Sequence, residues 1–222
     1  MRTLLKKLSS KISIDTYQRL LAFSILKNEF GAIESCQKYD KREDLWEVVI
    51  NSIGGVKAQI TFIEFGVHEG YSINYFSNKN TNNESIFTGL DSFEGLPEDW
   101  GTMKKGSFDT NGKIPDTNDM RVNYIKGWFQ DTWENLEKQL SKADLENLIV
   151  HYDADLYSST LFALCKIDSL KTPYVAIFDE FTGHESRALY NYCQAFNCEI
   201  EFLGKTIVNN FPFAVACRIT PR

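Results

Sequence analysis

The sequence has no pair of cysteines at the CxxC spacing that begins most zinc sites and thiol redox motifs. Its five cysteines are scattered, which predicts reduced thiols and a cytoplasmic protein. No run reaches the roughly 18 uninterrupted apolar residues of a membrane-spanning helix. Lys, Ser and Asp interrupt the N-terminal stretch MRTLLKKLSSKISIDTYQRLLAFSIL, so neither a signal peptide nor membrane insertion is expected.

An excess of positive charge is also missing. The 222 residues include 24 Lys and Arg against 30 Asp and Glu, a formal net charge of -6. Binding to nucleic-acid phosphates needs a positive field, so no nucleic-acid partner is expected. The 43% hydrophobic content excludes a disordered chain, and a chain of this length buries roughly 70% of its unfolded surface in one globular unit.

Apolar periodicity predicts an α/β fold. Helical spacing runs from about residue 14 to residue 51, and β-rich apolar runs then alternate with helical segments. The expected strands cover 59–67, 85–90, 121–126, 148–152, 174–178, 199–203 and 212–219; helices follow residue 70 and cover 132–140, 158–167 and 184–196. This order indicates a Rossmann-like, doubly wound, mostly parallel seven-stranded sheet with an antiparallel C-terminal hairpin. Residues 1–55 form an expected N-terminal helical extension, and residues 56–222 the main domain.

One long polar segment interrupts the alternation. Residues 97–119 contain Gly, Asn, Asp and Pro with little periodicity. A loop of this length inside a compact domain is usually functional or disordered. Because it follows the second strand of the main domain, we expect it over the mouth of the sheet.

Acidic residues follow four of the expected strands. Ligands of open α/β sheets bind at the carboxyl ends of the strands, so these side chains should share one rim. They are Glu64 and Glu69 around the first turn, Asp91 and Glu94 after the second strand, Asp153 and Asp155 after the fourth, and Asp179 and Glu180 after the fifth.

The first turn resembles a nucleotide-binding turn. Gly66 and Gly70 allow close approach of a ligand to the backbone, although the dinucleotide fingerprint GxGxxG is absent. Asp91 follows about 20 residues later, the spacing at which an acid binds a ribose diol. Glu64 inside an apolar strand needs a partner, which a cationic ligand would supply. S-adenosylmethionine carries an ammonium and a sulfonium, whereas acids would repel the two phosphates of NAD.

Five blocks together resemble the macrocin-type sugar O-methyltransferases. These are class I S-adenosylmethionine-dependent enzymes that act on sugar hydroxyls of macrolide and aminocoumarin antibiotics. The blocks run in order from about residue 62 to residue 181, with DSFEGLP and DADLYSST the most specific parts. They are FIEFGVHEGYS (62–72), GLDSFEGLPEDW (89–100), YIKGWFQDT (124–132), HYDADLYSST (151–160) and FDEF (178–181).

The resemblance implies a role for each matching position. Asp91 would hold the ribose, Ser92 and Phe93 would lie beside the adenine, and Gly127 and Trp128 would close over the cofactor. The remaining cofactor positions, most of them at the methionine end, would be Glu64, Phe65, Gly66, Val67, Gly70, Tyr71, Ser72 and Asp153.

The resemblance also implies a magnesium ion and a general base. Asp153, Asp179 and Glu180 would hold Mg²⁺, and Asp155 would be the base. The family usually has two Asp where this chain has Asp179-Glu180, so magnesium dependence is less firmly implied than methyl transfer. His68 or His184 could replace Asp155 as base, whereas His151 lies in a strand and is more typical of a core residue.

The expected function is Mg-assisted methylation of a hydroxyl on a sugar or glycosylated small molecule. A nucleotide-cofactor (NAD-type) oxidoreductase and a catalytically inactive cofactor-binding module are the alternatives. Trp100, Phe108 and Tyr17 could stack on the acceptor, whose identity the sequence leaves open. The apolar face of the front helix would also allow a homo-oligomer.

Overall fold

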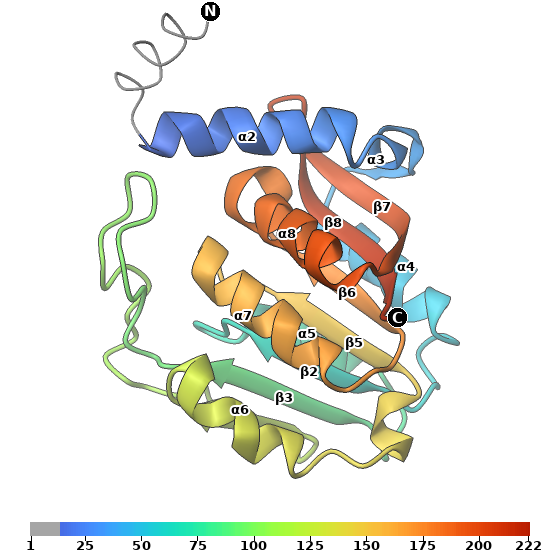
Figure 1. The fold of residues 1–222 in the computed structure, drawn as a ribbon. Coiled ribbons are helices and arrows are strands. Elements are labelled where there is room, and N and C mark those ends of the chain that lie inside the picture. The colour runs from blue at the N-terminus through green and yellow to red at the C-terminus, as the bar shows by residue number, and fades with distance from the viewer. Residues whose placement is uncertain (1–13) are drawn as a thin grey trace, which may run out of the picture.

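An eight-stranded mixed sheet forms the centre of the computed structural model, which describes residues 14–222 (Figure 1). The strand order is β1-β7-β8-β6-β5-β2-β3-β4, and β8 runs antiparallel to both of its neighbours. The strands are β1 (Lys38–Tyr39), β2 (Thr61–Phe65), β3 (Ile86–Asp91), β4 (Val122–Lys126), β5 (Leu148–Tyr152), β6 (Tyr174–Phe178), β7 (Glu199–Val208) and β8 (Phe211–Thr220). The Rossmann-like fold with an antiparallel C-terminal hairpin is confirmed.

The expected number of seven strands is wrong by one. The additional strand, β1, has two residues and pairs in parallel with β7 at the edge of the sheet. Two residues are too few to produce an alternating apolar pattern, so this strand leaves no periodic signal in the sequence.

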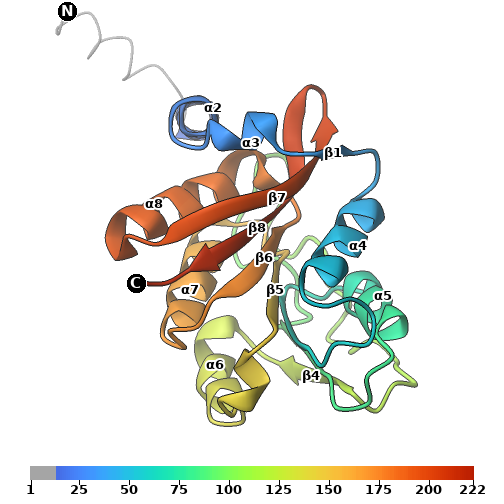
Figure 2. The ribbon, with the colours of Figure 1, turned by 90° about the vertical axis from the view of Figure 1, so that its right-hand side faces the viewer.

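Helices cover both faces of the sheet (Figure 2). Apolar side chains of α4 and α5 form one core with one face, and those of α2, α6, α7 and α8 form a second core with the other. The helical elements are α2 (Ile14–Asn28), α3 (Ala32–Ser35), α4 (Arg42–Ser52), α5 (Tyr71–Lys79), α6 (Phe129–Glu137), η1 (Ala143–Leu145), α7 (Tyr157–Asp168), η2 (Phe181–Glu185) and α8 (Ser186–Phe196). None of the helices within residues 14–222 is long and apolar enough to cross a bilayer.

The expected helical front segment is divided into α2, α3 and α4, with β1 between the last two. Ile25 and Leu26 of α2 are buried in the same core as α7 and α8. On the opposite face, Leu45 and Trp46 of α4 are fully buried. The front segment is therefore part of both cores. Its residues 1–13, within the expected extension of residues 1–55, lie outside the described part of the chain.

The parallel register places four strand ends together. β2 pairs with β3 on one side and with β5 on the other, and β6 follows β5. From β2 the chain adds β3 and β4 on one side and then β5 and β6 on the other, so the strand order reverses between β2 and β5. Ligands of open α/β folds bind at such a point. The expected loop lies between β3 and β4, and residues 92–121 contain no helix or strand.

Candidate ligand-binding site

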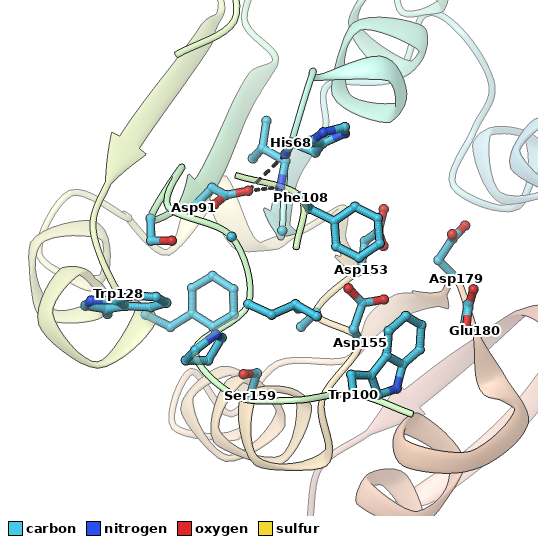
Figure 3. A pocket seen from close by; sticks show the side chains of 18 of the residues that line it. His68, Asp91, Trp100, Phe108, Trp128, Asp153, Asp155, Ser159, Asp179 and Glu180 are labelled. Carbon is cyan, nitrogen blue, oxygen red and sulfur yellow. Dashed lines mark hydrogen bonds between the residues drawn. The ribbon is translucent and has the colours of Figure 1, made fainter. Parts of the chain in front are cut away.

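A cavity of about 560 Å³ opens at the carboxyl ends of β2, β3, β5 and β6 (Figure 3). Its volume is in the range that holds a small organic ligand or cofactor. The loop between β3 and β4 contributes Pro97, Glu98, Trp100 and Phe108 to the wall, as its expected position predicts. The expected site residues that line the cavity are Gly66, Val67, Tyr71, Ser72, Asp91, Ser92, Trp128, Asp153, Asp155, Asp179 and Glu180.

Five expected cofactor residues lie outside the cavity wall. Glu64 and Phe65 are fully buried in β2, and Phe65 stacks against Tyr152. Phe93 is buried with its ring against Tyr124. Gly70 caps α5 with a φ of 77°, and the amide of Gly127 donates to the carbonyl of Asp91. These contacts are with other groups of the protein.

Asp91 joins the end of β3 to the turn after β2. Its Oδ2 accepts the backbone amides of Val67 at 2.8 Å and His68 at 2.9 Å, and its Oδ1 accepts the amide of Phe93 at 2.7 Å (Figure 3). Three amide donors fix the carboxylate in one orientation. Asp91 thus shapes the turn as well as facing the cavity.

A buried polar chain lies beneath the cavity. His151 Nδ1 donates to Glu64 Oε1 at 2.7 Å, and the hydroxyl of Ser72 donates to the same carboxylate oxygen. Burial lowers the pKa of His151, but the hydrogen bond and the charge of Glu64, together with the charges of Asp153 and Asp179, outweigh it, and the net pKa is raised. The structure therefore gives Glu64 a partner inside the protein, where the sequence suggested a cationic ligand.

Four carboxylates gather at one end of the cavity, opposite Asp91 and Trp128 (Figure 3). Burial, with Glu180 and Asp179 nearby, raises the pKa of Asp155 to about 7. Burial and Asp179 also raise the pKa of Glu180, and raise that of Asp153 well above its usual range. Asp155 has a left-handed φ of 55°, an uncommon conformation that is enriched at functional sites.

Arg42 of α4 partly balances this charge. Its Nη1 lies 3.3 Å from both carboxylate oxygens of Asp179, and its guanidinium packs over the rings of Trp46 and Tyr71. Arg42 is the one Lys or Arg among the described residues that line the cavity, against seven acids. These acids are Glu69, Asp91, Glu98, Asp153, Asp155, Asp179 and Glu180. The cavity is strongly acidic and suits a cationic ligand.

One group of side chains has the spacing of a metal site. Single ligand atoms of His151, Asp153 and Asp179 lie within 4.8 Å of one another. The expected set was Asp153, Asp179 and Glu180; this group contains the first two together with His151, and Glu180 is not in it. In the sequence His151 is part of an apolar strand, which favoured a core role.

Of the other histidines and aromatics considered, His68, Trp100 and Phe108 line the cavity. His184 lies elsewhere, where its Nδ1 accepts the amide of Tyr157 at the start of α7. Wall residues that sequence reasoning missed include Arg42, Glu98, Phe129, Gln130, Ser158 and Ser159. The two serines belong to the DADLYSST block, whereas no local pattern marks Arg42.

The raised pKa values predict that stability falls with rising pH. The pKa of Asp155 is about 7 in the folded protein and near 3.8 in the unfolded chain. The stability that its protonation contributes is therefore fully present below pH 3.8 and is lost as the pH rises to about 7. His151 changes stability in the same direction. Between pH 5 and pH 8 we expect the free energy of unfolding to fall by about 2–3 kcal/mol in urea titrations. Asp155→Asn should flatten this slope, and an unchanged slope would contradict the assignment.

The fold is similar to that of solved methyltransferases. An O-methyltransferase from Bacillus cereus in complex with SAH is 12% identical, with 97% of this chain and 96% of that chain covered and a TM-score of 0.53. A candidate rRNA methylase from Clostridium thermocellum is 15% identical, with 83% and 100% covered and a TM-score of 0.50. CalS11, a TDP-rhamnose 3'-O-methyltransferase of calicheamicin biosynthesis, is 16% identical, with 97% and 91% covered and a TM-score of 0.49.

No protein-family model and no curated protein matches the sequence. At these low identities, the similarity to solved structures establishes the fold. Membership of the macrocin-type family stays a prediction.

Proposed function

We propose that this protein is an S-adenosylmethionine-dependent O-methyltransferase that acts on a hydroxyl of a small molecule, with a sugar or glycoside as the expected acceptor. The observation that carries the proposal is the charge of the cavity, where seven carboxylates face one guanidinium. Such a wall attracts a sulfonium and an ammonium and repels a diphosphate. A solved O-methyltransferase has a similar fold, which also supports the proposal.

The cavity offers S-adenosylmethionine a place between Asp91 and the acidic end. Asp91 would accept hydrogen bonds from the ribose, and Ser92 and Trp128 lie in the same part of the wall. Gly66 and Val67 line the cavity at the turn, where the methionine portion would lie. When bound, this cofactor supplies the methyl group on its sulfonium, which the acceptor oxygen takes by in-line displacement.

The acidic end also suits a divalent cation. Asp153 and Asp179 provide carboxylate oxygens close together, as a hard cation requires. When bound, such a cation lowers the pKa of the acceptor hydroxyl and orients it. The acceptor's proton would pass to Asp155, whose pKa of about 7 suits a general base near neutral pH.

The mouth of the cavity suits a sugar ring. Trp100 and Phe108 contribute aromatic faces from the loop between β3 and β4, and Phe108 is 43% exposed. Aromatic rings with a free face pack well against the apolar face of a sugar, while nearby acids bind its hydroxyls. The same acids would repel the phosphates of an RNA acceptor.

The two alternatives fit the cavity less well. An NAD-type oxidoreductase would place a diphosphate against Glu69 and Asp153, with Arg42 as its one cationic neighbour in the described wall. An inactive binding module would not need the strained, proton-accepting Asp155. Cofactor binding without turnover on a broad panel of hydroxylated acceptors would favour the inactive module.

Calorimetric titration with S-adenosylmethionine tests the proposal. We expect one site of micromolar affinity, and we expect Asp91→Asn to weaken it about 10-fold or more because a charged hydrogen bond is worth about 1.5–3 kcal/mol. Asp116→Asn is the matched control, since its carboxylate is almost fully exposed in the same loop region. Absence of binding to the parent protein, or equal weakening in both variants, would contradict the assignment.

A further inference from the structure

We propose that the cation site of this cavity consists of His151, Asp153 and Asp179, and that it prefers a divalent transition ion such as Mn²⁺ or Co²⁺ to Mg²⁺. The inference rests on the proposed function, because it specifies the metal site of the same cavity. It replaces Glu180 by an imidazole, and the ligand set changes from all oxygen to mixed nitrogen and oxygen.

The three side chains converge because of their places in the sheet. His151 and Asp153 are two positions apart at the end of β5, so they point to the same face. Ile177 of β6 pairs with His151, and Asp179 follows it by two positions on that face. One ligand atom from each side chain lies within 4.8 Å of the others. Neighbouring ligand atoms at about 2.0–2.2 Å from one metal ion lie about 3.0–3.5 Å apart, so the side chains would move together by up to about 1–2 Å when an ion binds.

His151 is the independent sign of a ligand. Its side chain is fully buried, and its Nε2 has no hydrogen-bond partner within residues 14–222. Native proteins rarely leave a buried polar nitrogen without a partner. Because Glu64 already binds Nδ1, in this proposal the unpartnered Nε2 is the nitrogen that would ligate the ion beside Asp153 and Asp179.

Glu64 completes a pattern known from metal sites. Metal-binding imidazoles usually donate their second nitrogen to a carboxylate, which fixes the tautomer and the ring orientation. Glu64 Oε1 accepts from His151 Nδ1 at 2.7 Å, and Ser72 holds the same oxygen. The carboxylate inside β2 is thereby explained as a positioning residue for His151.

Arg42 would compete with a metal ion for the carboxylate of Asp179. Its guanidinium contacts both oxygens of Asp179, but its side chain is 39% exposed and at the rim. The guanidinium packs over Trp46 and Tyr71 in this position, and the partly exposed side chain can swing toward solvent while the buried His151 stays in place. Arg42 then neutralises Asp179 when no metal is bound.

The donor set decides the choice of metal. Affinity for a nitrogen-containing site rises along the first-row transition ions from Mn²⁺ through Co²⁺ to Cu²⁺, whereas Mg²⁺ favours carboxylate, carbonyl and water oxygens. A site with one imidazole and two carboxylates should therefore bind Mn²⁺ and Co²⁺ more tightly than Mg²⁺.

The test uses metal binding by the full chain after removal of metals with a chelator, without S-adenosylmethionine or acceptor. Calorimetry should show one Mn²⁺ site with affinity at least about tenfold above that for Mg²⁺. Electron spin-echo spectra of bound Mn²⁺ should show coupling to an imidazole nitrogen. Glu64→Gln should weaken Mn²⁺ binding about 10- to 100-fold, and His151→Gln at least as much. Glu180→Gln distinguishes this site from the all-oxygen ligand set and should weaken Mn²⁺ binding much less than His151→Gln does, since Glu180 lies outside the cluster.

Three results would overturn the proposal. They are Mn²⁺ bound without nitrogen coupling, loss of affinity in the Glu180 variant but not in the His151 variant, and no binding at millimolar Mn²⁺. If the buried His151 variant does not fold, the spectrum of Mn²⁺ bound to the parent protein still shows whether an imidazole nitrogen is a ligand. Since S-adenosylmethionine binding is titrated separately, failure of the metal site and failure of the methyltransferase assignment give different results.

Discussion

Asp155→Asn is expected to lower kcat by about 10²–10⁴-fold, the range of a general base, while S-adenosylmethionine affinity stays within about threefold. The carboxylate faces the cavity between Asp153 and Trp100, with the residues of the proposed acceptor mouth on one side (Figure 3). Asn keeps the size of the side chain and tolerates the left-handed φ of 55°, so the backbone should remain in place. What is lost is the ability to accept a proton.

The pH profile of the parent enzyme provides a second readout. With a pKa of about 7, Asp155 becomes an effective base as pH rises through neutrality, so kcat should rise between pH 6 and pH 8. The Asn variant should lack this rise. If His68→Gln removes turnover and Asp155→Asn does not, the base is His68, which also lines the cavity.

The second large effect is expected for Gly66→Ala. Gly66 has a φ of 93°, and a Cβ there would lie 1.8 Å from the carbonyl oxygen of Asp153. That oxygen belongs to the backbone after β5, so no side-chain rotation relieves the overlap. The variant should lose about 4 kcal/mol or more of unfolding free energy, or fail to fold, because β2 and β5 can no longer meet closely.

Gly106→Ala is the matched control. Gly106 has a similar φ of 84°, but a Cβ there would meet nothing within 4 Å. It should lose only the cost of the left-handed backbone, about 1–2 kcal/mol. Chemical denaturation of both variants separates backbone strain from overlap. Equal losses would show that the close approach of Gly66 to Asp153 does not limit stability.

The sequence predicts the strand ends well for a physical reason. β5 and β6 are buried on both faces, so their residues are apolar or aromatic except for His151, and both strands end abruptly before Asp153 and Asp179. Both strands occupy the expected residues, and their acids meet in one cavity. Long-range partners have no such local signal. Arg42 reaches Asp179 across 137 residues of chain, and no pattern near either residue marks the contact.

The role of Glu64 shows the same limit. An acid inside an apolar strand indicates that a partner exists, but not which one. Its partner, His151, is 87 residues away and opposite it in the register of β2 and β5. Pairing of these strands could have identified the contact, because the two residues would then face the same side. The sequence suggested a cationic ligand as this partner, and nothing near Glu64 in the chain indicated the histidine.

The short strand β1 has a consequence for the order in which the chain can fold. Its partner in the sheet is β7, more than 160 residues later, and Lys205 of β7 donates to the carbonyls of Ile33 and Glu34 just before β1. During synthesis the front segment therefore waits for nearly the whole chain before these contacts can form. Such distant pairing is slow because a long loop must close first. The apolar side of α2 packs mainly on η2 and α8, so it too has no surface to cover until these late elements emerge, and this is the stage at which the nascent protein most needs protection from aggregation.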